Sequence, residues 1–246
     1  MIHRFFTLRW LVTTLLVIAA AGGMVRLGIW QLDRLAERRA FNARVEAQIN
    51  APPLDLTGQF EPGSLYGMEY RQVTARGVFD PHQEILLRNQ VWENRPGYHL
   101  LTPLRLSGSN YVVLVDRGFI DLDQAAPAQR AAYAVPGPVE VRGVLRRPHV
   151  PRFFGVPDPT LAPGETRLDA WNAVNLERIQ EQVDGFLLPV YIQAAPDPAR
   201  PGPPYAQIEQ PDLSEGPHLG YALQWFAFAA VLGAGYPFFV RKQLGA

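Results

Sequence analysis

The sequence predicts an α+β membrane protein in which two transmembrane helices flank a mainly antiparallel β domain with short helices. Two apolar stretches lie near the ends of the chain, at 10–30 and 218–240. About 20 apolar residues are enough for a helix to cross a hydrocarbon core ~30 Å thick. Between the two stretches, short runs rich in β-branched and aromatic residues alternate with turn residues over 69–145. Such a pattern is typical of antiparallel strands, here expected to curl into a partial barrel.

The first predicted element is a transmembrane helix over 10–30, which follows a short basic tail over 1–9. Arg26 interrupts the apolar run, but an arginine near a helix end can extend its charged head to the membrane interface. A cleaved signal peptide is the alternative, because Ala19-Ala20-Ala21 offers small residues for cleavage. The length of the apolar run favours a helix that is not cleaved.

An extramembrane domain is expected over 31–193. Charges of opposite sign recur four residues apart after Trp30, which supports a solvated continuation of the first helix. This helix is predicted to stop near Ile49, before Pro52-Pro53. Strands are then predicted over 70–79, 84–89, 98–106, 111–119, 139–145 and 187–193.

Turn residues separate the predicted strands. Residues 107–110 predict a hairpin, and Arg95-Pro96-Gly97 is interpreted as a turn. The proline-containing stretch 152–169 is expected to be an irregular loop, and the apolar spacing over 175–183 predicts a short helix.

The last part of the chain returns to the membrane. A linker over 194–217 holds many prolines and is expected to be stiff, extended and unlikely to pack a core. It leads to the second transmembrane helix at 218–240 and a short tail at 241–246 that is expected to be cytoplasmic. Positive charges lie on both sides of the first helix, so the charge count alone leaves the orientation ambiguous.

Composition excludes several classes of function. The net charge is zero, so no basic surface for nucleic acid is indicated. The chain has no cysteine, which excludes disulfides, iron–sulfur clusters, covalent c-type haem and cysteine nucleophiles. Without a nucleophile motif, a metal-ligand cluster or a phosphate loop, the sequence is not expected to be that of an enzyme.

The start of the second helix carries the candidate ligand. His218, Tyr221, Ala222 and Trp225 follow one another at helical spacing, which places an imidazole and two aromatic rings on one stripe. An imidazole at a membrane border can ligate haem iron, and aromatic neighbours can pack against a porphyrin. The alternative is an interfacial belt, since Tyr and Trp favour the headgroup region in any membrane protein.

Several short motifs are similar to those of one family, and they occur in the same order. The first, Leu27-Gly28-Ile29-Trp30-Gln31-Leu32-Asp33-Arg34, resembles the motif that closes the first membrane helix of the Surfeit locus protein 1 family. The others that match are Gly77-Val78-Phe79-Asp80, Gly97 with Thr102-Pro103-Leu104, Val115-Asp116-Arg117-Gly118-Phe119, Val141-Arg142-Gly143, Leu188-Pro189-Val190-Tyr191 and His218-x-x-Tyr221-Ala222-x-x-Trp225. The resemblance covers about 27–241, and it departs from the family where Asp116 and Phe119 stand in place of Asn and Trp.

The resemblance implies an assembly factor for haem-copper cytochrome c oxidase that helps to deliver haem a to the catalytic subunit. The implied partners are that subunit, haem A synthase and the lipid bilayer. The alternative is a scaffold without a cofactor that holds an oxidase subunit during assembly. We expect a bacterial cytoplasmic membrane protein with both termini in the cytoplasm and the middle domain outside. In bacterial members the histidine of the last motif is the proposed haem contact, which is His218 here.

Two further hypotheses concern residues near this implied cofactor. Trp30 and Gln31 could meet the second helix, because they lie at the same border of the membrane. Arg117 could hold a haem propionate by a charge-assisted bond, whereas the alternative is a structural arginine paired with Asp80 or Glu84. Three other histidines are interpreted as ordinary strand or loop residues, namely His82, His99 and His149.

Overall fold

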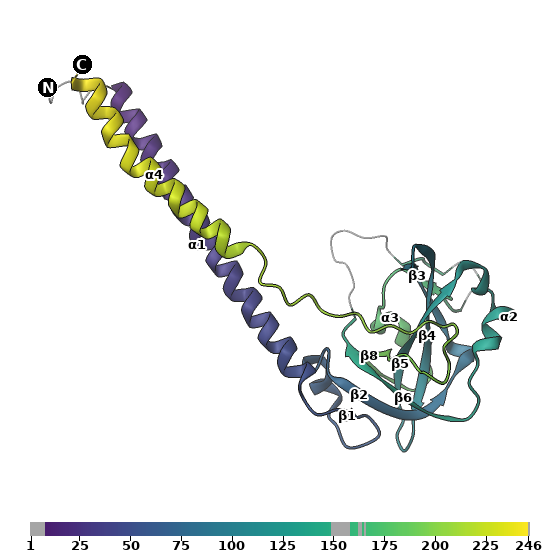
Figure 1. Cartoon of the computed structure of the whole chain (residues 1–246). Coiled ribbons are helices and arrows are strands. Elements are labelled where there is room, and N and C mark those ends of the chain that lie inside the picture. Colours follow the sequence, from purple (N-terminus) through teal and green to yellow (C-terminus); the bar gives the residue numbers. More distant parts are fainter. Residues whose placement is uncertain (1–7, 149–157, 162–163, 165, 246) are drawn as a thin grey trace. The chain divides into compact units, whose positions relative to one another are not determined.

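The computed structural model describes residues 8–148, 158–161, 164 and 166–245 (Figure 1). His149 and much of the loop expected at 152–169 lie outside the described residues. The chain forms two compact units. The helix unit consists of Met1–Arg44 with Pro211–Ala246, and the barrel unit consists of Val45–Gln210.

Two long helices dominate the helix unit. Helix α1 spans Leu8–Ile49, which confirms the predicted stop before Pro52-Pro53. Its 42 residues correspond to about 63 Å, twice the thickness of a hydrocarbon core. Helix α4 spans His218–Gly245. Both are long and apolar enough to cross a membrane, and only 6% and 11% of their most apolar stretches are buried within the protein. Neither helix is therefore the core helix of a soluble domain.

The two helices meet along one stripe, which we call the seam. On α1 the covered residues recur at intervals of three and four, and only Phe41 breaks the pattern between 14 and 42. They are Thr14, Val17, Ala21, Met24, Gly28, Gln31, Leu35, Arg38 and Asn42. On α4 the same intervals give His218, Ala222, Trp225, Ala229, Leu232, Tyr236 and Val240, with Phe226 beside them. This spacing is that of a coiled-coil interface.

Contacts along the seam show that α1 and α4 run antiparallel (Figure 1). Near one end, the hydroxyls of Thr14 and Tyr236 lie 2.7 Å apart. Gly28 packs against the ring of Phe226 so closely that a Cβ there would lie 2.6 Å from a ring carbon. Small residues at such points let membrane helices approach one another.

At one end of the seam, Arg38 and Asn42 of α1 contact the chain that leads into α4. Arg38 donates to the carbonyl oxygens of Asp212 and Ser214. Arg39 forms a bidentate ion pair with Glu215 at 2.7 and 2.8 Å. This segment is therefore fixed along α1 within the helix unit, so His218 enters α4 at a defined place.

The barrel unit is built on one mixed sheet of eight strands, whose order is β1-β2-β6-β8-β5-β4-β3-β7. Their bounds are β1 Leu54–Asp55, β2 Gln72–Phe79, β3 Ile85–Trp92, β4 Arg95–Leu106, β5 Tyr111–Asp121, β6 Pro138–Arg146, β7 Ala170–Trp171 and β8 Phe186–Ala194. Strand β2 also pairs with β4, so β2, β6, β8, β5 and β4 close into a ring. Of the eight pairings, β1–β2, β3–β7 and β5–β8 are parallel, so the sheet is mainly antiparallel as predicted.

Strand β5 lies at the centre of the packing. Val113 and Val115 point into the core of the ring with residues of β2, β4, β6 and β8. Val112 and Leu114 point the other way and pack with Trp171 and the short helix α3, Leu176–Gln180. Burial of both faces explains why β5 is an almost continuous apolar run rather than an alternating one.

One predicted turn is wrong. Arg95-Pro96-Gly97 begins β4, and the turn lies one step earlier, at Glu93 and Asn94. Both turn residues have positive φ, 48° and 62°. A two-residue hairpin turn needs this left-handed backbone to match the twist of its strands. The hairpin predicted at 107–110 is confirmed, because β4 ends at Leu106 and β5 begins at Tyr111.

The linker expected at 194–217 is not an unattached spacer. Tyr205 pairs with Phe119 as an antiparallel bridge, and its ring stacks on Trp92 with centroids 5.6 Å apart. The backbone of Tyr205 also lies against Gly118, where a Cβ would be 2.3 Å from the Tyr205 carbonyl carbon. The part of the linker up to Gln210 thus belongs to the barrel unit.

Candidate functional site

His218 is the first residue of α4 and lies half-buried on the seam. Its Nδ1 is 2.8 Å from Oε1 of Gln31 on α1. This contact supports the hypothesis that Gln31 meets the second helix, whereas Trp30 is exposed. With Gln31 accepting, the proton sits on Nδ1 and the unshared electron pair sits on Nε2.

The other edge of the imidazole faces Gly216. A Cβ at this position would lie 3.5 Å from Cδ2 and 3.6 Å from Nε2 of His218. The φ of Gly216 is +68°, a left-handed backbone that favours glycine. No hydrogen bond to Nε2 occurs among the residues that the structure describes. Nδ1 is thus hydrogen-bonded, and Nε2 has no hydrogen-bond partner among the described residues, which fits a haem ligand.

The two aromatic residues of the predicted stripe, Tyr221 and Trp225, lie on different faces of α4 in the structure. Trp225 is half-buried on the seam and contacts Phe228 edge to face, with centroids 6.2 Å apart. Tyr221 lies off the seam and is 49% exposed. The residue that occupies the seam between His218 and Trp225 is Ala222, which is fully buried. Of the two aromatic residues in the predicted stripe, only Trp225 therefore shares the packed face with His218 and Ala222.

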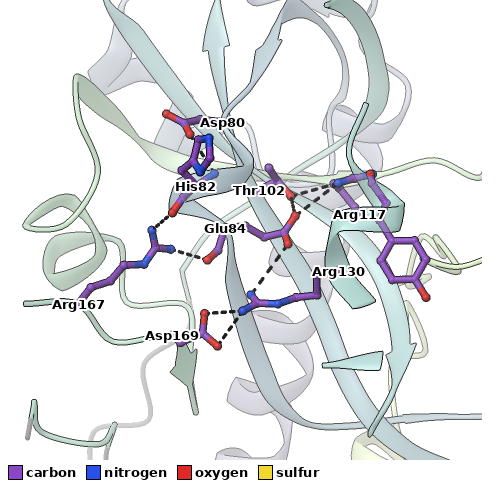
Figure 2. A network of polar contacts seen from close by, with 9 residues as sticks. Asp80, His82, Glu84, Thr102, Arg117, Arg130, Arg167 and Asp169 are labelled. Carbon is purple, nitrogen blue, oxygen red and sulfur yellow. Dashed lines mark hydrogen bonds and ion pairs between the residues drawn. The ribbon is translucent and has the colours of Figure 1, made fainter. Parts of the chain in front are cut away.

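Arg117 belongs to the barrel unit, where it is part of a buried polar network (Figure 2). Its guanidinium lies 3.5 Å from the carboxylate of Glu84 and donates to the carbonyl of Tyr133. The hydroxyl of Thr102 donates to the same carboxylate at 2.7 Å. Of the two pairings considered for Arg117, the structure has the one with Glu84, while Asp80 pairs with Arg105.

Burial governs the electrostatics of this network. Burial raises the pKa of Glu84, although Thr102, Arg117 and Arg130 act in the opposite direction. Burial likewise lowers the pKa of Arg117, which Glu84 partly offsets. Arg130 bridges Glu84 to Asp169, and its Nε has no partner among the described residues. The network joins Glu84, directly before β3, to β4, β5 and helix α2, Pro127–Arg130, by opposite charges and hydrogen bonds.

The sequence interpretation missed a second pair, the half-buried His99 and the buried Asp116. Nδ1 of His99 lies 2.9 Å from the Asp116 carboxylate, and the other oxygen of Asp116 accepts from the backbone of Gly118 at 3.0 Å. His99 was therefore wrongly interpreted as an ordinary strand residue. The pair follows from the register of β4 and β5, in which Leu101 pairs with Asp116 and His99 lies two residues away, and local sequence patterns do not show this register.

The His99–Asp116 pair predicts a pH-dependent stability. Burial alone would lower the pKa of His99, but the hydrogen bond and charge of Asp116 outweigh it, and the pKa is raised above 6.5. The pair therefore contributes its full stability below the pKa of an unfolded histidine and loses it as the pH rises through the folded pKa. We expect His99→Gln to lower the free energy of unfolding most at pH values below the pKa of an unfolded histidine and progressively less as the pH rises above it. An equal loss at every pH would contradict this assignment.

Comparisons with known proteins agree with the motif order. The chain matches the SURF1 family over residues 18–230. It is 30% identical to a "SURF1-like protein" of Monosiga brevicollis over 88% of this chain and 83% of the relative. It is 27% identical to "Surfeit locus protein 1" of Mus musculus over 88% of this chain and 71% of the relative.

A bacterial relative is matched over nearly its whole length. The "SURF1-like protein" of Rickettsia conorii is 26% identical over 94% of this chain and 92% of the relative. The family match includes the seam residues from Ala21 to Ala229 and the whole barrel unit. The chain therefore belongs to the SURF1 family.

Proposed function

We propose that this chain is an assembly factor for haem-copper cytochrome c oxidase and that it holds haem a at His218 for delivery to the catalytic subunit. Membership of the SURF1 family supports the assembly role. Two helices of membrane-spanning length and bacterial relatives support a place in the bacterial cytoplasmic membrane. In this proposal both termini are cytoplasmic, the barrel unit lies outside, and haem A synthase supplies the cofactor.

The cofactor proposal rests on the surroundings of the two ring nitrogens of His218. It lies at the end of a helix pair, its Nδ1 is engaged by Gln31, and its Nε2 edge faces a glycine. Bound haem would supply the iron and its redox chemistry. Here His218 would provide the nitrogen ligand, and Trp225 and the exposed ring of Tyr221 would offer apolar contacts on either side of the stripe.

A propionate contact by Arg117 is not needed for this proposal. The guanidinium of Arg117 is engaged by Glu84, Thr102 and Tyr133, and its side chain is only 10% exposed. To bind a propionate, Arg117 would have to exchange these partners for the carboxylate of the haem. We therefore assign the ligand role to His218 and treat Arg117 as a secondary candidate.

The test is the visible spectrum of full-length protein that has been co-expressed with a pathway for haem a synthesis. We expect a Soret band that persists through size exclusion and is largely lost in His218→Ala. His82→Ala is the matched control, because His82 is an exposed histidine of the barrel unit. An unchanged Soret band in His218→Ala would remove His218 from the proposal.

A scaffold without a cofactor is the second candidate. Large apolar side chains outside the seam, such as Leu16, Val231 and Phe238, are well exposed and could pack against an oxidase helix. This function predicts that the catalytic subunit copurifies with the protein although no Soret band is present. It also predicts that His218→Ala leaves this copurification unchanged.

A further inference from the structure

The contact between Gln31 and His218 joins residues that are 187 positions apart in the chain. Both side chains are half-buried on the seam, so the hydrogen bond of 2.8 Å is sheltered from solvent. The described residues give the Gln31 side chain no other hydrogen bond. This amide is thus placed on α1 at the position where it meets the first side chain of α4.

We propose that Gln31 is a positioning residue that prepares His218 to bind a metal, an inference that rests on the function proposed above. By accepting a hydrogen bond from Nδ1, Gln31 selects the tautomer in which Nε2 carries the unshared pair. It also fixes the plane of the ring, which places Nε2 on the side of Gly216, a residue without a side chain. Partners of this kind orient metal-binding histidines in many proteins and raise their basicity.

An amide is suited to this role because it accepts a hydrogen bond without carrying a charge. A carboxylate at the same place would accept more strongly and would increase the electron density at Nε2. An aliphatic side chain of similar size would keep the packing of the seam but would leave Nδ1 without its acceptor. Gln31→Glu and Gln31→Leu therefore change the hydrogen bond in opposite directions.

The experiment titrates haem a into full-length protein in lipid nanodiscs and measures the dissociation constant and the midpoint potential of the bound haem. We expect Gln31→Leu to raise the dissociation constant by about 10- to 100-fold. We expect Gln31→Glu to retain the affinity and to lower the midpoint potential, because a more basic imidazole favours the ferric state. Thr14→Val is the matched control, since it removes a hydrogen bond between α1 and α4 that is remote from His218, that to Tyr236.

The outcomes separate this inference from the proposed function. If His218→Ala binds haem a as the parent does, the proposed function fails. If His218→Ala loses haem but Gln31→Leu keeps the parent dissociation constant and Gln31→Glu keeps the parent potential, only the role of Gln31 fails. If Thr14→Val weakens binding as much as Gln31→Leu, the effect is one of helix packing, and the positioning role is again overturned.

Discussion

Replacing Arg117 with leucine is expected to destabilise the barrel unit by about 3 to 5 kcal/mol, which is the typical cost of removing one partner from a buried ion pair. Glu84 and Arg117 have side chains that are only 6% and 10% exposed. Without Arg117, the carboxylate of Glu84 keeps Thr102 and the more distant Arg130, 3.9 Å away. The loss should appear in chemical unfolding of the full chain, followed by the signal of the β structure.

Two further variants make this prediction specific. Arg142→Leu is the surface control, because Arg142 is 77% exposed although it also pairs with a glutamate. It should change stability little, since solvent screens such pairs. The double variant Glu84→Leu with Arg117→Leu should recover part of the loss, because no unpaired carboxylate remains. A single Arg117→Leu variant as stable as Arg142→Leu would show that the network is not needed for stability.

Replacing Gly118 with alanine is expected to cost about 3 kcal/mol or more and to detach the segment around Tyr205 from the barrel. The φ of Gly118 is +114°, which a side chain adopts only with strain of about 1 to 2 kcal/mol. The new Cβ would also lie 2.3 Å from the carbonyl group of Tyr205. Two backbone hydrogen bonds between Phe119 and Tyr205, 2.8 and 3.0 Å long, would then be lost at about 1 kcal/mol each.

Gly137 provides the matched control for this substitution. Its φ is also positive, +80°, but a Cβ there would meet nothing within 4 Å. Gly137→Ala should therefore cost only the backbone strain of about 1 to 2 kcal/mol. Limited proteolysis reports the detachment directly, since the chain near Tyr205 should become cleavable in Gly118→Ala alone. Equal stability and equal cleavage in the two variants would refute the steric part of the argument.

The sequence predicted the secondary structure better than the pairing of the strands. Strand β5 and the hairpin at 107–110 could be identified because apolar runs and turn residues are local signals. Closure of the ring depends on three residue pairs between β2 and β4, among them Gly77 with Leu106. Local patterns do not encode such a register. The docking of Tyr205 was missed for the same reason, because proline content describes the stiffness of a chain and not its contacts.

Part of the candidate site could be predicted from the sequence. His218 was predicted from its helical spacing with two aromatic residues at the membrane border and from the family resemblance, and the spacing correctly placed Trp225 on its face. The same spacing also included Tyr221, which lies off the seam. Residues at i, i+3 and i+4 cover a wider part of the helix surface than the part that contacts a single neighbouring helix. The narrower line that contains Gln31 appears only in the burial of α1, because covered and exposed positions of this helix are equally apolar in the sequence.

The regular spacing of the seam residues restricts insertions and deletions within the two helices. Each helical residue turns the chain by about 100°, so one inserted or deleted codon within α4 would rotate every later side chain away from α1. The pairing of Thr14 with Tyr236 would then be lost, together with all contacts beyond the change. Substitutions at the lipid-facing positions carry no such penalty. Related sequences should therefore vary in residue type at the exposed positions outside the seam while conserving the number of residues between His218 and Val240.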